Sequence, residues 1–314
     1  MERSCAVAVV PEGAPAIEAA VESGGGKVVS PEDADAIVWT DPAHPGDLKE
    51  LLKSSPAEWV QLPFAGIEGF VAAGVIDSDH LWTCAKGAYG PATAEHALAL
   101  ILAAARRLHI HARATSWEGE AARFSPDETA WRRLKDATVV LVGTGGIGRA
   151  LAAMLEPLGA TVIAVNRSGR PLRGASRTVT VDSLADIVPE GDFIVLAAAL
   201  TSQTRGLFDS AMLAQMRSDA WIVNVARGPL IDTPALVEAL QAGSIGGAAL
   251  DVTDPEPLPD GHPLWSLEDA LITPHVANTW AMAVPELAAM VARNVAAWCR
   301  GDELEGIVDP DLGY

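Results

Sequence analysis

Basic residues are scarce in this sequence of 314 residues: 22 Lys and Arg stand against 41 Asp and Glu, which gives a formal net charge of −19. An excess of negative charge of this size repels phosphate backbones and anionic membrane surfaces. We therefore exclude nucleic acids and membranes as partners. Any anion that the protein binds must be held by a local site.

Cysteines and long apolar runs are also few. Cys5, Cys84 and Cys299 form no CxxC pair and no metal-type spacing with histidine, which predicts reduced thiols and no metal site. The apolar stretches, such as residues 97–105, are far shorter than the roughly 20 residues that cross a bilayer. The N-terminal residues do not resemble a secretory signal peptide. These absences favour a soluble cytoplasmic protein.

Short apolar runs alternate with helical patterns along the chain, which predicts parallel sheets covered by helices. The hydrophobic content of 49% and the length fit two globular domains. The first series contains expected strands at 5–10, 37–40 and 58–62 and helices at 14–22 and 46–52. The second contains expected strands at 138–142, 161–165, 193–197, 220–225, 248–252 and 271–273, and helices at 147–158, 210–216 and 234–240. Long helices are expected at 91–110 and 285–299, with a polar arm at 111–135.

A glycine-rich turn follows the first strand of the second series. Residues 138–149 read TVVLVGTGGIGR, so the GxGxxG motif lies between an apolar strand and a helical segment, where a dinucleotide-binding turn requires it. Gly143 permits the tight turn, Gly145 lets a pyrophosphate approach, and Gly148 allows close packing of the helix on the strand. The expected contacts to the cofactor are Gly143, Thr144, Gly145, Gly146, Ile147 and Gly148.

The next strand carries the information on which nicotinamide cofactor is preferred. A carboxylate that binds the ribose of NAD is expected about 20 residues after the glycines, but this sequence has Asn166 there. An asparagine does not repel a 2′-phosphate, and Arg167 or Arg170 can bind one, with Ser168 beside them. We therefore predict NADP(H) over NAD(H). The alternative is that the arginines are solvated loop residues and Asn166 accepts either cofactor.

Three further segments place polar side chains just after expected strands: residues 224–229, 251–257 and 273–278. In an open parallel sheet the carboxyl ends of the strands face the ligand crevice. We therefore expect these segments beside the nicotinamide. The remaining expected cofactor contacts come from this edge and are Ala198, Val225, Ala226 and Asp251.

The chain resembles the D-isomer-specific 2-hydroxyacid dehydrogenases. The matching pieces, in the family's order and spacing, are VGTGGIG (142–148), NVARGPLID (224–232), ALDVTDPEP (249–257) and TPHVA (273–277), with QLPFAGIE (61–68) and ATAEH (92–96) in the first part. The resemblance implies a Rossmann-type parallel-sheet cofactor domain and a smaller flavodoxin-like α/β substrate domain. Residues 1–95 and 285–314 would form the substrate domain, and residues 96–284 the cofactor domain.

The family's catalytic residues fall on Arg227, Glu256 and His275. By this resemblance His275 donates a proton to the carbonyl oxygen during reduction and accepts it during oxidation. Glu256 favours the cationic imidazole and fixes its tautomer, while Arg227 binds the substrate carboxylate. The residues expected to bind substrate are Phe64, Ala65, Gly66, Arg227, His275 and Trp280, although Phe64 could also be part of a plain turn and Trp280 part of the core.

The leading hypothesis is a cytoplasmic, homodimeric reductase of a small 2-keto acid, of the glyoxylate or hydroxypyruvate type, that uses NADPH. The family's dimers place the interface at residues 91–131. One alternative is an NAD-dependent D-3-phosphoglycerate dehydrogenase. Another is a non-catalytic protein that senses a nucleotide on the same fold. The joint presence of Arg227, Glu256 and His275 disfavours this last hypothesis, because sensing requires no proton transfer.

Overall fold

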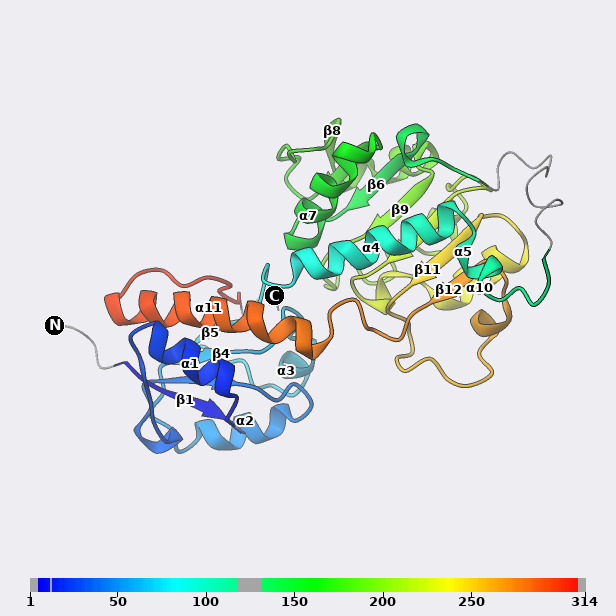
Figure 1. Ribbon diagram of the computed structural model, residues 1–314. Helices are drawn as coiled ribbons and strands as arrows, with labels where there is room; N and C mark the ends of the chain where they lie inside the picture. The colour runs from blue at the N-terminus through cyan, green and yellow to red at the C-terminus, as the bar shows by residue number, and fades with distance from the viewer. Residues whose placement is uncertain (1–4, 12, 118–130, 310–314) are drawn as a thin grey trace. The chain divides into compact units, whose positions relative to one another are not determined.

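A computed structural model describes residues 5–11, 13–117 and 131–309. The chain forms two compact units, Met1–Tyr89 with Thr279–Tyr314, and Gly90–Asn278 (Figure 1). The sequence analysis placed the divisions a few residues later, inside two long helices. The observed divisions lie at the N-terminal ends of these helices, because each helix packs as a whole on one unit: α4 (Gly90–Ala105) on the second and α11 (Trp280–Arg300) on the first.

The first unit contains a five-stranded parallel sheet in the order β2-β1-β3-β4-β5. Its strands are β1 (Ala6–Val10), β2 (Lys27–Val28), β3 (Ala36–Trp39), β4 (Trp59–Gln61) and β5 (Leu81–Thr83), and its helices besides α11 are α1 (Pro15–Ser23), α2 (Pro45–Leu52), α3 (Glu68–Ala72) and the 3-10 turn η1 (Pro31–Asp33). Both sheet faces are covered: Val7 and Val9 belong to the core with α1 and α11, and Ala8 belongs to the opposite core. The order 2-1-3-4-5 is that of flavodoxin-like folds.

The second unit contains a seven-stranded parallel sheet in the order β12-β11-β10-β9-β6-β7-β8. Counted from β6, this is the 3-2-1-4-5-6 order of dinucleotide-binding domains with one more strand. The strands are β6 (Thr138–Val142), β7 (Thr161–Asn166), β8 (Arg177–Thr180), β9 (Phe193–Leu196), β10 (Trp221–Asn224), β11 (Gly247–Leu250) and β12 (Ala270–Ile272). The α-helices besides α4 are α5 (Leu108–His111), α7 (Gly146–Leu155), α8 (Leu184–Ile187), α9 (Ser210–Leu213) and α10 (Thr233–Gln241). The 3-10 helices are η3 (Leu134–Asp136), η4 (Glu156–Leu158), η5 (Val181–Ser183), η6 (Val188–Glu190), η7 (Gly228–Leu230) and η8 (Pro263–Ser266).

The expected fold class, two parallel α/β sheets, is confirmed. The strands that sequence analysis missed are β2, β5 and β8, which all lie at sheet edges. An edge strand is short or has one exposed side, so it lacks the continuous apolar run by which the central strands were found. The start of the last helix at Pro285 was also wrong. Helix α11 begins at Trp280 and contains Pro285 in its second turn, where only one backbone hydrogen bond is lost.

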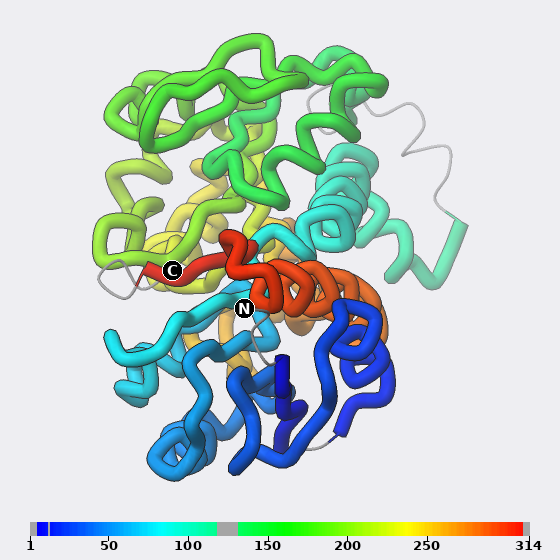
Figure 2. The backbone as a smooth tube through the Cα atoms, turned by 90° about the vertical axis from the view of Figure 1, so that its left-hand side faces the viewer, coloured from blue at the N-terminus to red at the C-terminus, as the bar shows by residue number. Residues whose placement is uncertain are grey.

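A disulfide joins the two ends of the first unit. Cys5 precedes β1 and Cys299 lies in the last turn of α11; their Cα atoms are 5.6 Å apart. Figures 1 and 2 show α11 beside α1, and both cysteines pack against the same apolar core. The expectation of three reduced thiols is therefore wrong for this pair, because distance along the chain says nothing about distance in the fold. Cys84 is a buried free thiol.

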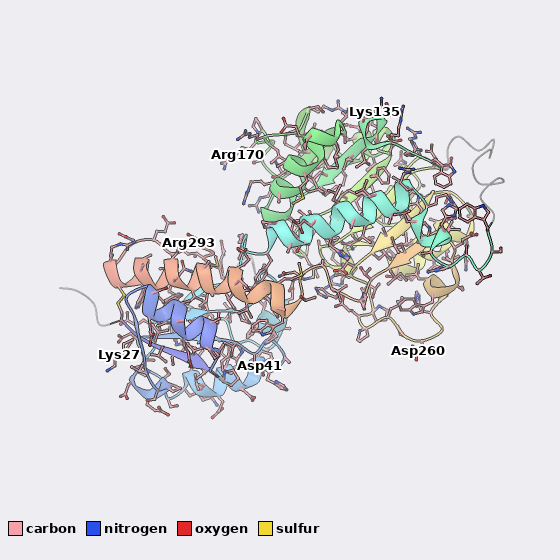
Figure 3. All side chains as sticks on the ribbon, in the orientation of Figure 1. Lys27, Asp41, Lys135, Arg170, Asp260 and Arg293 are labelled. Atoms are coloured by element: carbon pink, nitrogen blue, oxygen red, sulfur yellow. A yellow bond between two sulfur atoms is a disulfide. The ribbon has the colours of Figure 1, made fainter. Side chains whose placement is uncertain are left out.

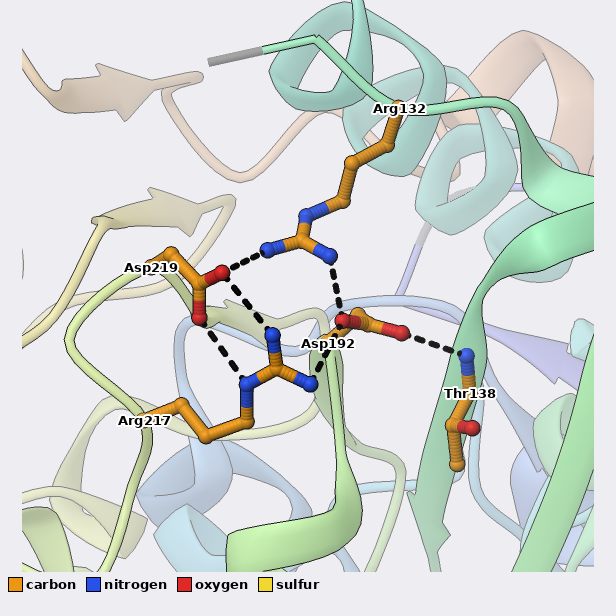
Figure 4. Close-up of polar contacts among 5 residues, drawn as sticks. All are labelled: Arg132, Thr138, Asp192, Arg217 and Asp219. Atoms are coloured by element: carbon orange, nitrogen blue, oxygen red, sulfur yellow. Dashed lines mark hydrogen bonds and ion pairs between the residues drawn. The ribbon is translucent and has the colours of Figure 1, made fainter. Parts of the chain in front are cut away.

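An ion-pair network ties Arg132 to the amino ends of the strands of the second sheet (Figure 4). Arg132 contacts both Asp192, just before β9, and Asp219, before β10. Arg217 contacts the same two carboxylates, at 3.3 Å and 2.9 Å. Asp192 also accepts a hydrogen bond of 2.7 Å from the N–H of Thr138, the first residue of β6. The network lies at the amino ends of these strands, whereas the ligand crevice is expected at their carboxyl ends.

Two further observations concern membrane-spanning helices and metal-binding groups. Within the described chain, no helix combines the length and the apolar character needed to cross a bilayer. In the same residues, His, Cys, Asp and Glu side chains form no group of three or more that could hold a metal ion.

Candidate active site

The glycine-rich turn lies between β6 and α7, at the point where the strand order reverses. Gly143 has φ +104°, and a Cβ atom there would lie 2.5 Å from the carbonyl oxygen of Ala197, after β9. A Cβ on Gly148 would lie 2.1 Å from the carbonyl oxygen of Gly143. Around Gly145 no heavy atom lies within 4 Å of the corresponding position. The turn is therefore closed toward the sheet and open at Gly145, beside the free N–H groups of a helix start, so the site fits a pyrophosphate.

Asn166, the last residue of β7, organises the loop that follows it. Its side-chain amide donates to the hydroxyl of Thr144 at 3.2 Å and to the carbonyl of Arg170 at 2.9 Å. Its side-chain oxygen accepts from the N–H of Ser168 at 3.1 Å. Arg167 and Arg170 are exposed, and Figure 3 shows Arg170 at the exterior of the second unit. No carboxylate stands at the end of this strand, and two guanidinium groups lie within four residues of it.

Arg227 follows β10 and is positioned by a buried asparagine. The side chain of Asn224 donates to the carbonyl of Arg227 at 2.8 Å and accepts from the N–H of Ala226 at 3.1 Å. Next to Arg227, a Cβ on Gly228 would lie 1.9 Å from the carbonyl oxygen of Thr253. The backbone beside Arg227 therefore packs directly on the segment after β11, at a separation that only glycine permits.

Asp251, directly after β11, holds the segment that carries His275. Its side chain is 1% exposed. The carboxylate accepts from the hydroxyl of Thr273 at 2.6 Å, from the N–H groups of Val276 and Ala277 at 3.0 Å each, and lies 3.3 Å from Nε2 of His96. Burial by itself raises the pKa of Asp251, but the hydrogen bonds from His96, Thr273 and the two N–H groups outweigh it and leave the pKa below its usual value. The carboxylate is therefore charged and fully engaged at neutral pH.

His275 occupies a backbone conformation that non-glycine residues rarely adopt, with φ +52°. Its N–H donates to the carbonyls of Asp251 at 2.8 Å and Thr273 at 3.0 Å. The Nδ1 atom of its ring lies 2.6 Å from Oε1 of Glu256, and the His275 side chain is 51% exposed. Among the described residues, none forms a hydrogen bond with Nε2. Glu256 thus fixes one ring nitrogen and leaves the other directed away from it and able to exchange a proton with a ligand.

In the first unit, β4 leads into the loop 62–66. Phe64 lies edge-on to Trp280 with ring centroids 6.0 Å apart, and edge-on to Tyr89 at 6.1 Å. The N–H groups of Phe64, Ala65 and Gly66 have no acceptor within the described chain. Three successive backbone N–H groups without an acceptor in the described residues are donors that an anion can use.

The structure brings together several of the residues that the sequence singled out. Glu256 with His275 and Phe64 with Trp280 are direct neighbours, and Arg227, Asp251 and His275 follow the adjacent strands β10, β11 and β12. Ala198 follows β9 against the glycine turn, and Val225 and Ala226 follow β10. His96, to which the sequence analysis assigned no role in the site, contacts it: its Nε2 lies 2.9 Å from the Thr273 hydroxyl. No sequence spacing reveals this contact, because His96 and Thr273 are 177 positions apart.

Comparison with known proteins agrees with this geometry. A model of the NAD binding domain of D-isomer specific 2-hydroxyacid dehydrogenases matches residues 98–277. The chain belongs to this family. One relative is the mouse glyoxylate reductase/hydroxypyruvate reductase. The two chains are 34% identical over 219 residues, which are 69% of this chain and 66% of that protein.

Solved structures of D-2-hydroxyacid dehydrogenases have the same fold over nearly the whole chain. A D-isomer specific 2-hydroxyacid dehydrogenase from Xanthobacter autotrophicus Py2, solved with NADPH and MES, has a TM-score of 0.83 and 26% identity, covering 99% of this chain and 100% of that chain. An NADPH-dependent glyoxylate/hydroxypyruvate reductase from Sinorhizobium meliloti, solved with NADP and sulfate, has a TM-score of 0.80 and 25% identity, covering 98% of this chain and 99% of that chain. The protein is therefore an oxidoreductase that uses a nicotinamide cofactor, and its relatives act on small keto and hydroxy acids.

Proposed function

We propose that the protein reduces a small 2-keto acid, of the glyoxylate or hydroxypyruvate type, to the D-2-hydroxy acid. The observation that carries this proposal is the pair formed by Glu256 and His275, with the Nε2 atom of the imidazole left without a partner among the described residues. A bound reduced nicotinamide supplies a hydride to the carbonyl carbon. We assign to His275 the proton that the carbonyl oxygen takes up, and the same nitrogen receives it in the oxidative direction.

Arg227 and the loop 64–66 are the groups we assign to the substrate carboxylate. A guanidinium group can form two parallel hydrogen bonds with a carboxylate, and the three free N–H groups of the loop supply neutral donors for the same kind of anion. Glu256 keeps its contact with Nδ1, and so holds the ring in place while Nε2 exchanges the proton. One hydride and one proton together convert the carbonyl group to the alcohol.

Turnover of a panel of 2-keto acids tests this function. We expect the wild-type protein to oxidise NADPH with glyoxylate or hydroxypyruvate and to form the D-isomer where the product is chiral. His275→Ala should lose turnover while it still binds NADPH with unchanged affinity. Exclusive activity on 3-phosphoglycerate with NAD would instead favour the phosphoglycerate alternative. A wild-type protein that binds NADPH but turns over no acid of the panel would favour a nucleotide-sensing role.

We propose NADPH as the preferred cofactor. The support is the absence of a carboxylate at the end of β7, the neutral Asn166 there, and the exposed guanidinium groups of Arg167 and Arg170 beside Ser168. Two structural neighbours were solved with NADPH or NADP. The ratio of kcat/KM with NADPH to that with NADH measures the preference, and a ratio below one would contradict it.

We also propose a homodimer in the cytoplasm. Support for the dimer comes from apolar side chains exposed in the expected interface segment 91–131: Leu108 is 53% exposed and Trp117 is 95% exposed. Residues 118–130 of that segment lie outside the described residues. Light scattering of Trp117→Ser against wild type tests the interface, and a wild-type monomer would exclude it. The cytoplasmic location stays a prediction from the sequence.

A further inference from the structure

The loop 62–65 has all four of its carbonyl groups turned toward the interior of the first unit. The carbonyl of Leu62 accepts from Nε2 of Gln61 at 2.9 Å, and that of Pro63 accepts from the hydroxyl of Tyr89. The carbonyl of Phe64 accepts from the N–H of Ala85 at 3.1 Å. The carbonyl of Ala65 lies 3.8 Å from the thiol of Cys84. Four successive carbonyls therefore have internal donors, whereas the N–H groups of Phe64, Ala65 and Gly66 have no acceptor among the described residues.

The donors come from three separate elements. Gln61 is the last residue of β4, Tyr89 precedes α4, and Cys84 and Ala85 follow β5. Burial raises the pKa of the Cys84 thiol, and burial likewise raises the pKa of the Tyr89 hydroxyl. Both groups therefore keep their protons across the physiological range. They act as permanent donors to the loop carbonyls.

Gln61 is itself oriented by a buried polar chain that reaches α11. Its Oε1 atom accepts from the amide of Asn294 at 2.9 Å and from the hydroxyl of Thr83 at 2.9 Å. The hydroxyl of Thr83 accepts from the indole N–H of Trp59 at 2.8 Å. Gln61, Thr83 and Asn294 are completely buried. With both acceptor positions of Oε1 occupied, the Gln61 amide has one orientation, in which its N–H group faces the carbonyl of Leu62.

We propose that Gln61, Tyr89 and Asn294 are positioning residues for substrate binding, which turn the carbonyls of loop 62–65 inward so that the N–H groups of Phe64, Ala65 and Gly66 face a substrate carboxylate. The inference rests on the proposed function and adds residues that do not touch the substrate. A peptide plane that rotates presents its carbonyl oxygen in place of its N–H, and an oxygen repels the carboxylate. Fixing the carbonyls therefore fixes the sign of the partial charge that the substrate meets.

Tyr89→Phe is the most conservative test, because it removes one donor and leaves the ring in place. We expect the KM for glyoxylate to rise about three- to tenfold, the range for one lost hydrogen bond, with kcat changed less than twofold. The dissociation constant of NADPH should not change. Ser55→Ala is the matched control, since it also removes a hydroxyl that donates to a carbonyl of this unit, that of Pro31 at 3.0 Å. Ser55 precedes β4, whereas the loop 62–65 follows this strand.

Binding of oxalate, a carboxylate that cannot be reduced, separates this inference from the proposed function. Calorimetry in the presence of NADPH should show weaker oxalate binding in both Tyr89→Phe and Asn294→Leu, and unchanged binding in Ser55→Ala. A wild-type protein that binds oxalate but reduces no keto acid would refute the function and leave the loop to be judged by these affinities. Unchanged KM and unchanged oxalate affinity in folded Tyr89→Phe would overturn the inference, as would an equal loss in Ser55→Ala.

Discussion

Replacement of Asp251 should reduce stability and activity together. In Asp251→Ala the hydroxyl of Thr273, two backbone N–H groups and His96 all lose their acceptor. Removing one partner of a buried charged arrangement costs about 3–5 kcal/mol, and we expect a loss of this size in the free energy of unfolding. Asp251→Asn keeps one accepting oxygen but turns an amide N–H toward a backbone donor, so its loss should be about 1–3 kcal/mol.

Activity should fall because the same carboxylate holds the unusual backbone of His275. A non-glycine residue in this region is strained by about 1–3 kcal/mol and persists only where its surroundings impose it. Once the contact to Val276 or to Ala277 is lost, the segment can relax and His275 leaves its position. We expect kcat/KM in Asp251→Asn to fall about 10- to 100-fold, the rate equivalent of this strain.

The dependence on pH provides a second test of the same site. The folded-state pKa of Asp251 is below its usual value, so its stabilising contribution is complete above the unfolded pKa of about 3.9 and is lost as the pH falls through the folded value. Urea unfolding between neutral and acidic pH should show a smaller acid-induced loss in Asp251→Asn. Asp232→Asn, which changes the N-cap of α10, is the control, because asparagine caps as well as aspartate. Wild-type stability and activity in Asp251→Asn would refute this reasoning.

Three further predictions concern the cofactor turn, the ribose loop and the disulfide. Gly145→Ala should unfold like wild type, because its Cβ meets no protein atom, but it should raise the dissociation constant of NADPH at least tenfold, because the Cβ fills the space of the pyrophosphate. Gly148→Ala should instead lower the free energy of unfolding. Unfolding followed by circular dichroism, together with titration of the cofactor, distinguishes the two variants. Arg170→Ala should raise the KM for NADPH about tenfold without changing that for NADH, as steady-state kinetics would show, and equal effects on both would exclude a 2′-phosphate contact. Cys5→Ser should lower the free energy of unfolding by about 2–4 kcal/mol, measured in urea without reductant. Thiol titration of the native wild-type protein should find no reactive group, because Cys84 is buried.

The central strands and the cofactor turn were predictable from the sequence because each is encoded locally. The strand 138–142 has the bounds expected from its apolar run, and the glycine spacing at 143–148 requires only the residues around it. The two α/β fold types followed from the family resemblance and from the alternation of expected strands and helices. Edge strands such as β8, which reads RTVT with no fully buried residue, carry no comparable pattern.

Contacts between distant segments could not be predicted. The disulfide joins residues 294 positions apart, and the hydrogen bond from Asn294 to Gln61 spans 233 positions. A buried amide or histidine on a helix has the same local sequence pattern whether it packs passively or orients a loop. His96 and Asn294 therefore became visible as parts of a site only when the packing of α4 and α11 was known.

The most direct test of the central claim is the rate of hydride transfer to glyoxylate in a single turnover, followed by the absorbance of the reduced nicotinamide in a stopped-flow instrument, for wild type and His275→Gln. We predict that the glutamine variant binds NADPH as wild type does and transfers hydride about 100- to 10,000-fold more slowly, the contribution of a positioned general acid. A variant that transfers hydride at the wild-type rate would contradict the assignment of the proton to His275.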